Sequence, residues 1–139
     1  MEREYIAEWF RFAEMDLATA EYLKDMRPQP LEIICFHCQQ SAEKSLKGYL
    51  ISKTFTEQSK THDLIFLNSI CTKIDEHFNY IDKACGTLTR YGVQPRYPQE
   101  IRITEQDTLK AIEYAHLIWE FKPLADVRLE VNKHDDDLN

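Results

Sequence analysis

Residues 35–50 read CFHCQQSAEKSLKGYL, and two shorter segments follow them, THDL at 61–64 and RYP at 96–98. Apolar and small side chains recur at three- and four-residue steps through the long segment, as on one face of an α-helix. The pattern extends over roughly residues 31–53 and predicts this buried face: Leu31, Ile34, Cys35, Cys38, Ala42, Leu46 and Tyr49. We expect this helix to lie at the centre of the fold.

The chain on either side of this segment also has helical patterns. Apolar residues at the same spacing predict a helix over about residues 3–26, which RPQP at 27–30 ends. A turn this short makes the first two helices antiparallel. A third helix is expected to follow Thr61 as its N-cap, with a break near Asn79. Its buried stripe, continued beyond the break, is predicted to be Leu64, Leu67, Cys71, Ile74, Phe78, Ile81, Ala84, Leu88 and Tyr91.

The C-terminal third predicts two more helices. Two prolines exclude a helix over 92–98, which is expected to be a connector. Thr104 and Asp107 then match a capping box with Asp in place of Glu or Gln. The helix that they open is predicted to turn inward Leu109, Ile112, Ala115, Trp119 and either Ile118 or Phe121. Pro123 interrupts this helix, and a final short helix ends near residue 131. The fold class is therefore all-α, an up-and-down bundle of four to five helices.

Composition and charge limit the classes of protein that this chain can represent. With 139 residues, 43% hydrophobic content and three glycines, the chain predicts one globular domain over 1–131 and a polar, acidic, disordered tail over 132–139. A net charge of -7 argues against broad binding to a phosphate backbone, which needs a dense cationic face. The sequence has neither a signal-peptide pattern nor an apolar run that approaches about 18 residues. We therefore expect a cytoplasmic protein that does not enter membranes.

Four cysteines raise the question of metal or redox chemistry. Cys35 and Cys38 form a CxxC pair around His37, a spacing found in zinc and redox sites. No second CxxC accompanies them, and both lie on the apolar side of the predicted helix. We interpret all four cysteines as reduced core residues and expect no metal and no cofactor.

The predicted central helix carries a polar face as well as an apolar one. His37, Gln40, Lys44 and Lys47 fall within one quadrant, away from the buried stripe, and are available to a ligand, to a partner chain or to water. Ile33 and Phe36 lie on the same side and give the helix a second apolar surface. A second apolar surface needs a second contact, so we expect a homodimer.

His62 and Asp63 follow the predicted cap Thr61 directly. An acidic residue is favoured at a helix N-terminus, so local capping accounts for Asp63. Histidine also has a pKa suited to acid–base chemistry, so a functional role for this pair stays open beside the capping role.

A third group of polar residues surrounds the predicted connector. Arg90, Arg96 and Arg102 occur there together with Tyr91 and Tyr97. Arginine binds phosphate through its bidentate fork and tyrosine can stack on a base, so the region suits RNA or a nucleotide. The alternative is a loop held to the surface by arginine stacked on tyrosine.

The segments at 35–50, 61–64 and 96–98, in this order and spacing, resemble the HEPN domain family. That resemblance implies a small helical protein associated with nucleotides or RNA, which commonly dimerises and often stands beside a minimal nucleotidyltransferase. In some members it also implies a ribonuclease motif, an arginine and a histidine with four to six residues between them. These two residues act without metal at the dimer interface.

The arginines near the connector have no histidine at that distance, whereas Arg128 and His134 have five residues between them. Leu129 stands where the motif usually has a polar residue. The leading hypothesis is a dimeric HEPN-like interaction module for a nucleotide, RNA or a nucleotidyltransferase, within a toxin–antitoxin-like or defence pair. The alternatives are a metal-independent endoribonuclease that uses Arg128 and His134, and a structural helical bundle without a ligand.

Overall fold

The computed structural model describes residues 2–53, 60–93 and 102–137, with side chains described through residue 133. This part of the chain forms α-helices and short 3₁₀ helices and contains no β-strand. Its elements in chain order are α1 (Glu2–Leu23), α2 (Leu31–Ser52), α3 (Leu64–Ile74), the 3₁₀ helix η2 (Glu76–Ile81), α4 (Asp82–Leu88), the 3₁₀ helix η3 (Thr89–Tyr91), α5 (Glu105–Glu120) and α6 (Lys122–Asp137). The prediction of an all-α helical bundle is confirmed.

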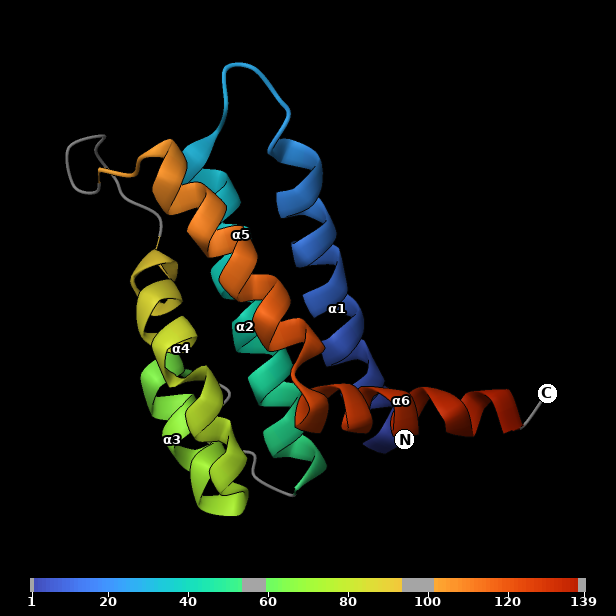
Figure 1. The fold of residues 1–139 in the computed structure, drawn as a ribbon. Helices are drawn as coiled ribbons and strands as arrows, with labels where there is room; N and C mark the ends of the chain where they lie inside the picture. The colour runs from blue at the N-terminus through green and yellow to red at the C-terminus, as the bar shows by residue number, and fades with distance from the viewer. Residues whose placement is uncertain (1, 54–59, 94–101, 138–139) are drawn as a thin grey trace.

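Helix α2 lies at the centre of the bundle, as its sequence pattern predicts. Its most extensive packing is against the antiparallel α1, followed by α5 and then α3 (Figure 1). The predicted apolar face is buried from Ile34 to Tyr49, and only Leu31 at its start is partly exposed. Three helices thus cover most of the circumference of α2 and leave a limited part of it open.

Helix α3 begins and ends at different residues from those the sequence predicted. Its N-cap is Asp63, not Thr61, and the Asp63 carboxylate accepts hydrogen bonds from the backbone N–H of Ile65 and Phe66. The break falls at Asp75, where the backbone is extended, four residues before Asn79. A 3₁₀ helix and α4 continue from there. Of the predicted stripe, Ile74 alone is exposed, because it immediately precedes this break.

The capping box that opens α5 is present as predicted. The Thr104 side chain accepts from Asp107 N–H, and the Asp107 carboxylate accepts from Thr104 N–H. The prediction that Leu109 points inward is wrong: its side chain is 61% exposed. Thr108 occupies the buried position instead, where its hydroxyl lies 3.7 Å from Cys35 Sγ.

Helix α6 is longer than the predicted short helix and crosses the end of the bundle near the N-terminus (Figure 1). The turn between α5 and α6 lies at Phe121, whose backbone is extended (φ -59°, ψ 125°). The helix then runs to Asp137, so positions 132–137 are helical where the sequence predicted a disordered tail. Val131 of α6 packs with Ile6, Phe10 and Ile51 in a small second core.

Within the described residues, no helix combines the length and the apolar character needed to span a bilayer.

The close approach of α1 and α2 depends on a glycine. A Cβ atom added at Gly48 would lie 2.9 Å from Cε2 of the buried Phe10 ring. That distance is shorter than a van der Waals contact, so a side chain at this position forces the two helices or the ring to shift. Gly86 in α4 is exposed and has no atom within 4 Å of an added Cβ.

We predict opposite effects for the same substitution at these two helical glycines. Gly86→Ala should raise the free energy of unfolding by about 0.5–1 kcal/mol, the difference in helix propensity. Gly48→Ala should lower it by on the order of 1 kcal/mol, because overpacking outweighs the propensity gain. Urea unfolding of both variants followed by circular dichroism measures the difference, and equal effects would show that the helices do not approach this closely.

Candidate functional site

The open part of α2 is a short run of side chains that α1, α3 and α5 leave partly or fully exposed. We refer to them as the α2 face; they are Ile33, Phe36, His37, Gln40 and Lys44. The prediction of an accessible polar stripe beside two apolar residues therefore holds for these five positions.

Asp16 of α1 binds two residues of the α2 face. Its Oδ1 lies 2.8 Å from His37 Nδ1, and its Oδ2 accepts a hydrogen bond of 2.6 Å from Lys44 Nζ. The Asp16 side chain is largely buried, whereas both partners are partly exposed. One carboxylate thus fixes the positions of an imidazole and an ammonium group at the surface, and Nε2 is the His37 ring nitrogen left for a ligand.

Aromatic rings flank this polar cluster on two helices. Phe36 makes an edge contact with the His37 ring, with ring centres 5.8 Å apart. On α1, Phe12 is 46% exposed, and Lys44 Nζ lies 5.9 Å from the centre of its ring. Polar and apolar surface therefore alternate across the boundary between α1 and α2.

Lys47 does not belong to the accessible face, and its predicted availability is wrong. Its side chain is 3% exposed and donates a hydrogen bond of 2.8 Å to Glu43, which is 5% exposed. Trp9 of α1 lies over it, with Lys47 Nζ 5.8 Å from the centre of its ring system. A helical wheel of α2 alone cannot predict that Lys47 is buried, because the ring that covers it comes from another helix.

Glu43 connects α2 to the segment before α3. Its carboxylate lies 3.0 Å from His62 Nδ1 and accepts a hydrogen bond of 3.1 Å from Gln39 Nε2. Burial raises the pKa of Glu43, but hydrogen bonds from Lys47 and Gln39 outweigh that effect and hold this pKa below its usual range. The His62 ring is held by its Nδ1 while its side chain stays 61% exposed. His62 is thus anchored by a buried carboxylate and accessible to a ligand.

Thr61 and Asp63 of the THDL segment have a structural role. Asp63 is the N-cap of α3, as capping by this pair predicts, and Thr61 Oγ1 accepts a hydrogen bond from Asp63 N–H. Thr89 also donates its hydroxyl proton toward Asp63. The Asp63 carboxylate therefore already has several donors within the chain.

We predict that Lys47→Met lowers the free energy of unfolding by about 3–5 kcal/mol, because it leaves the Glu43 carboxylate buried without its ammonium partner. Lys110→Met is the matched control, since Lys110 and Glu113 form an exposed pair whose loss costs under about 0.5 kcal/mol. Urea unfolding of both variants measures these changes. A loss of similar size in both would mean that Lys47 and Glu43 are not enclosed.

The structure favours the stacking alternative for Arg90. Its guanidinium lies 4.9 Å from the centre of the Tyr91 ring and donates a hydrogen bond of 2.7 Å to Tyr91 Oη. Tyr91 is buried, so its ring is not available to stack on a base. Arg102 is exposed. Arg96 and Tyr97 lie outside the described residues.

Arg128 and His134 belong to the same helix but to different sides of it. Arg128 lies over the Trp119 ring system at 3.7 Å and donates a hydrogen bond to the Trp119 carbonyl oxygen. Burial lowers the pKa of Arg128. Six residues of α-helix separate positions 128 and 134 by about 9 Å along the axis and about 120° around it. The His134 side chain lies outside the described residues.

The cysteines lie in the core, as the sequence predicted. All four are buried and free. Burial raises the pKa of every thiol, that of Cys35 to about 11 and that of Cys85 to about 12. Among the residues that the structure describes, no group of three histidine, cysteine or acidic side chains is placed to hold a metal ion.

Two acidic residues that organise this site were not predicted from the sequence. Asp16 binds His37 and Lys44, and Glu43 binds Lys47 and His62. Neither acid was among the predicted site residues. A signal was present for Asp16, because it falls beside Ala13 and Leu17 on the apolar face of the first helix. A charged residue at such a position needs a partner of opposite charge.

The fold and this face define a small all-α domain built around one helical hairpin. The chain belongs to the HEPN domain family, whose model matches residues 6–125. TT1696 from Thermus thermophilus shares the fold, with 20% identity and a TM-score of 0.71 over 91% of this chain and 99% of that chain. ST0689, an archaeal HEPN homologue, is 25% identical, with a TM-score of 0.62 over 91% and 97%. No curated protein sequence matches the chain significantly.

Proposed function

We propose that this HEPN protein is a dimeric interaction module that binds RNA or a nucleotide and acts without catalysis of its own. The proposal includes a minimal nucleotidyltransferase as a protein partner, in a toxin–antitoxin-like or defence pair, and a cytoplasmic location. The α2 face carries the proposal, because it places polar groups fixed by a carboxylate beside exposed apolar side chains.

The apolar part of this face suits a second copy of the chain. Ile33 on α2 and Phe12 on α1 are exposed, and Phe36 is partly exposed. Aromatic side chains supply much of the binding energy of protein interfaces, and a two-fold axis lets one patch meet itself. A dimer formed here buries these side chains.

The polar part of this face suits a phosphate-bearing ligand. Lys44 supplies a cation, and His37 and His62 each offer a ring Nε2 while Nδ1 lies against a carboxylate. Gln40, on the same helix, donates from its Nε2 to Gln39 Oε1 at 2.8 Å, which leaves its amide oxygen for a ligand. Lys44 is the cationic donor of this set, and the two Nε2 atoms donate to a phosphate when the imidazoles carry both protons. This small set fits a local contact with one or two phosphates, and the acidic chain as a whole disfavours long tracts of nucleic acid.

The endoribonuclease alternative receives less support from the geometry. Arg128 is held against Trp119 and its carbonyl oxygen. A catalytic group must reach the reacting atoms within hydrogen-bond distance. Arg128 also lies on α6, whereas the polar groups considered above lie on α1, α2 and the segment before α3.

We predict that the protein elutes at twice the protomer mass in light scattering at micromolar concentration, and that Phe36→Glu shifts it to the protomer mass. The added charge is costly to bury in an apolar contact. Tyr22→Glu is the control, because Tyr22 is 83% exposed on α1 and should leave the mass unchanged. A wild-type protein at the protomer mass would contradict the dimer.

We predict that a labelled RNA oligonucleotide of mixed sequence binds the protein in EDTA without being cleaved. Lys44→Gln should weaken binding roughly tenfold, about 1.4 kcal/mol for one charge-assisted contact, and Lys110→Gln should leave it unchanged. Fluorescence anisotropy measures binding, and gel electrophoresis of the same samples measures cleavage. Cleavage that Arg128→Ala abolishes would favour the endoribonuclease alternative over this proposal. Absence of RNA binding would contradict the proposed binding function.

A further inference from the structure

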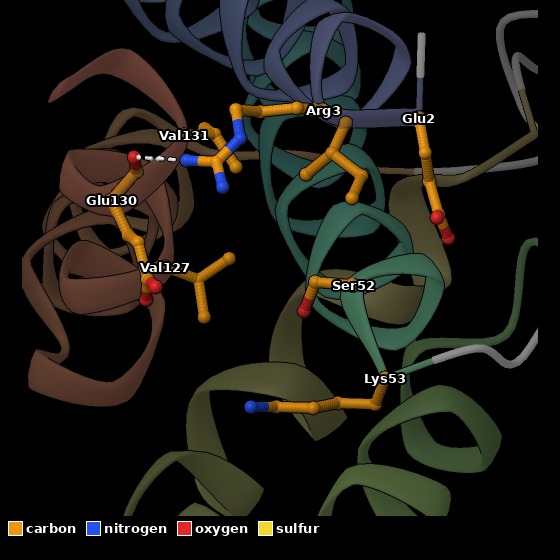
Figure 2. A pocket seen from close by; sticks show the side chains of 8 residues that line it. Glu2, Arg3, Ser52, Lys53, Val127, Glu130 and Val131 are labelled. Atoms are coloured by element: carbon orange, nitrogen blue, oxygen red, sulfur yellow. Dashed lines mark hydrogen bonds between the residues drawn. The ribbon is translucent and has the colours of Figure 1, made fainter. Parts of the chain in front are cut away.

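A hollow of about 520 Å³ is lined by residues from the N-terminal end of α1, the C-terminal end of α2 and α6. Figure 1 shows how these three elements come together. This volume lies within the range of about 300–1,000 Å³ that small-molecule sites occupy. The residues that line it are Glu2, Arg3, Ile6, Ser52, Lys53, Val127, Glu130 and Val131. Figure 2 shows Arg3 and Lys53 on opposite sides of the hollow, with Ser52 between them and Val127 facing Ser52.

One part of the hollow is apolar. Ile6 and Val131 are buried members of the small second core, and the partly buried Val127 packs against them. Branched aliphatic side chains of this kind favour an apolar ligand body, because its transfer from water contributes about 0.8 kcal/mol per buried methylene.

Arg3 gives the hollow a positioned positive charge. Its Nη1 donates a hydrogen bond of 3.1 Å to the carbonyl oxygen of Glu130, which fixes the guanidinium at the edge of the hollow (Figure 2). Arg3 forms no ion pair with any carboxylate among the described residues. Arg11, on the same helix, is by contrast paired with Glu8 at 2.9 Å. The remaining N–H donors of Arg3 therefore have no acidic acceptor within the described chain.

The charges around the hollow limit the ligand to a single negative charge. Lys53 is the second cation of the lining, and its Nζ lies 5.4 Å from the centre of the Tyr49 ring. The two carboxylates of the lining, those of Glu2 and Glu130, balance the two cations. Because these charges cancel, the lining gives a dianionic phosphate no net attraction, whereas one carboxylate matches the planar fork of an arginine.

We propose that this hollow binds a small monocarboxylate with a short aliphatic body, its carboxylate on Arg3 toward Lys53 and its body on Ile6, Val127 and Val131. Five of the eight lining residues lie outside the residues 6–125 that the HEPN model matches. Ser52 also lies 15 residues after His37 on α2, about 22 Å along the helix axis. The site is thus separate from the α2 face, and its test does not depend on the proposed function.

Titration of the 15N-labelled full chain with hexanoate, followed by amide NMR shifts, tests the site. We expect saturable shifts at Ile6, Val127 and Val131, and no such shifts with the neutral hexanamide. Arg3→Gln should weaken hexanoate binding roughly tenfold, since it removes one charge-assisted contact of about 1.4 kcal/mol. Arg11→Gln is the matched control on the same helix and should bind hexanoate as the wild type does.

A second variant tests the apolar part and leaves Arg3 intact. Val127→Trp places a large side chain in the hollow and should abolish the hexanoate shifts, while circular dichroism shows that the helices are retained. Equal shifts with hexanamide and hexanoate would overturn the proposal. So would wild-type affinity in Arg3→Gln or Val127→Trp, or shifts that cluster away from the hollow.

Discussion

The carboxylate of Glu43, enclosed among the helices, constrains the arrangement of the polar groups around α2. A buried charge is stable only when it is paired and hydrogen-bonded. Lys47 supplies the opposite charge one helical turn away, and Gln39 donates from the preceding turn. The remaining partner, His62, lies outside α2 and directly before α3. The Glu43 carboxylate therefore connects α2 to the segment from which the third helix begins.

Asp16 repeats this arrangement nearer to the surface. It pairs with a lysine and a histidine as Glu43 does, but its lysine partner, Lys44, is partly exposed, whereas Lys47 is buried. The Asp16 carboxylate is largely buried, so it holds Lys44 and His37 in place while their side chains remain partly exposed. The Glu43–Lys47 pair is thus enclosed within α2, whereas the Asp16–Lys44 pair joins α1 to α2 and leaves Lys44 partly exposed.

Helix α6 gives this domain a second surface of different chemistry. The chain turns at Phe121, and Leu124 is fully buried just after the turn. This anchoring directs α6 across the ends of α1 and α2 (Figure 1), where Val131 completes the small second core. The hollow beside it is lined mostly by residues outside the segment shared with the HEPN family. The α2 face and this hollow thus differ both in place and in the side chains that line them.

The sequence by itself determined those features whose causes are local. The period of the apolar residues predicted α1 and α2, and the capping box of Thr104 and Asp107 is complete within four residues. Only the tertiary structure decided which polar side chains stay accessible. Lys47 lies in the same quadrant as Lys44, yet Trp9 from α1 covers it. Exposure depends on neighbouring helices distant in the chain, and the pattern of one helix does not contain that information.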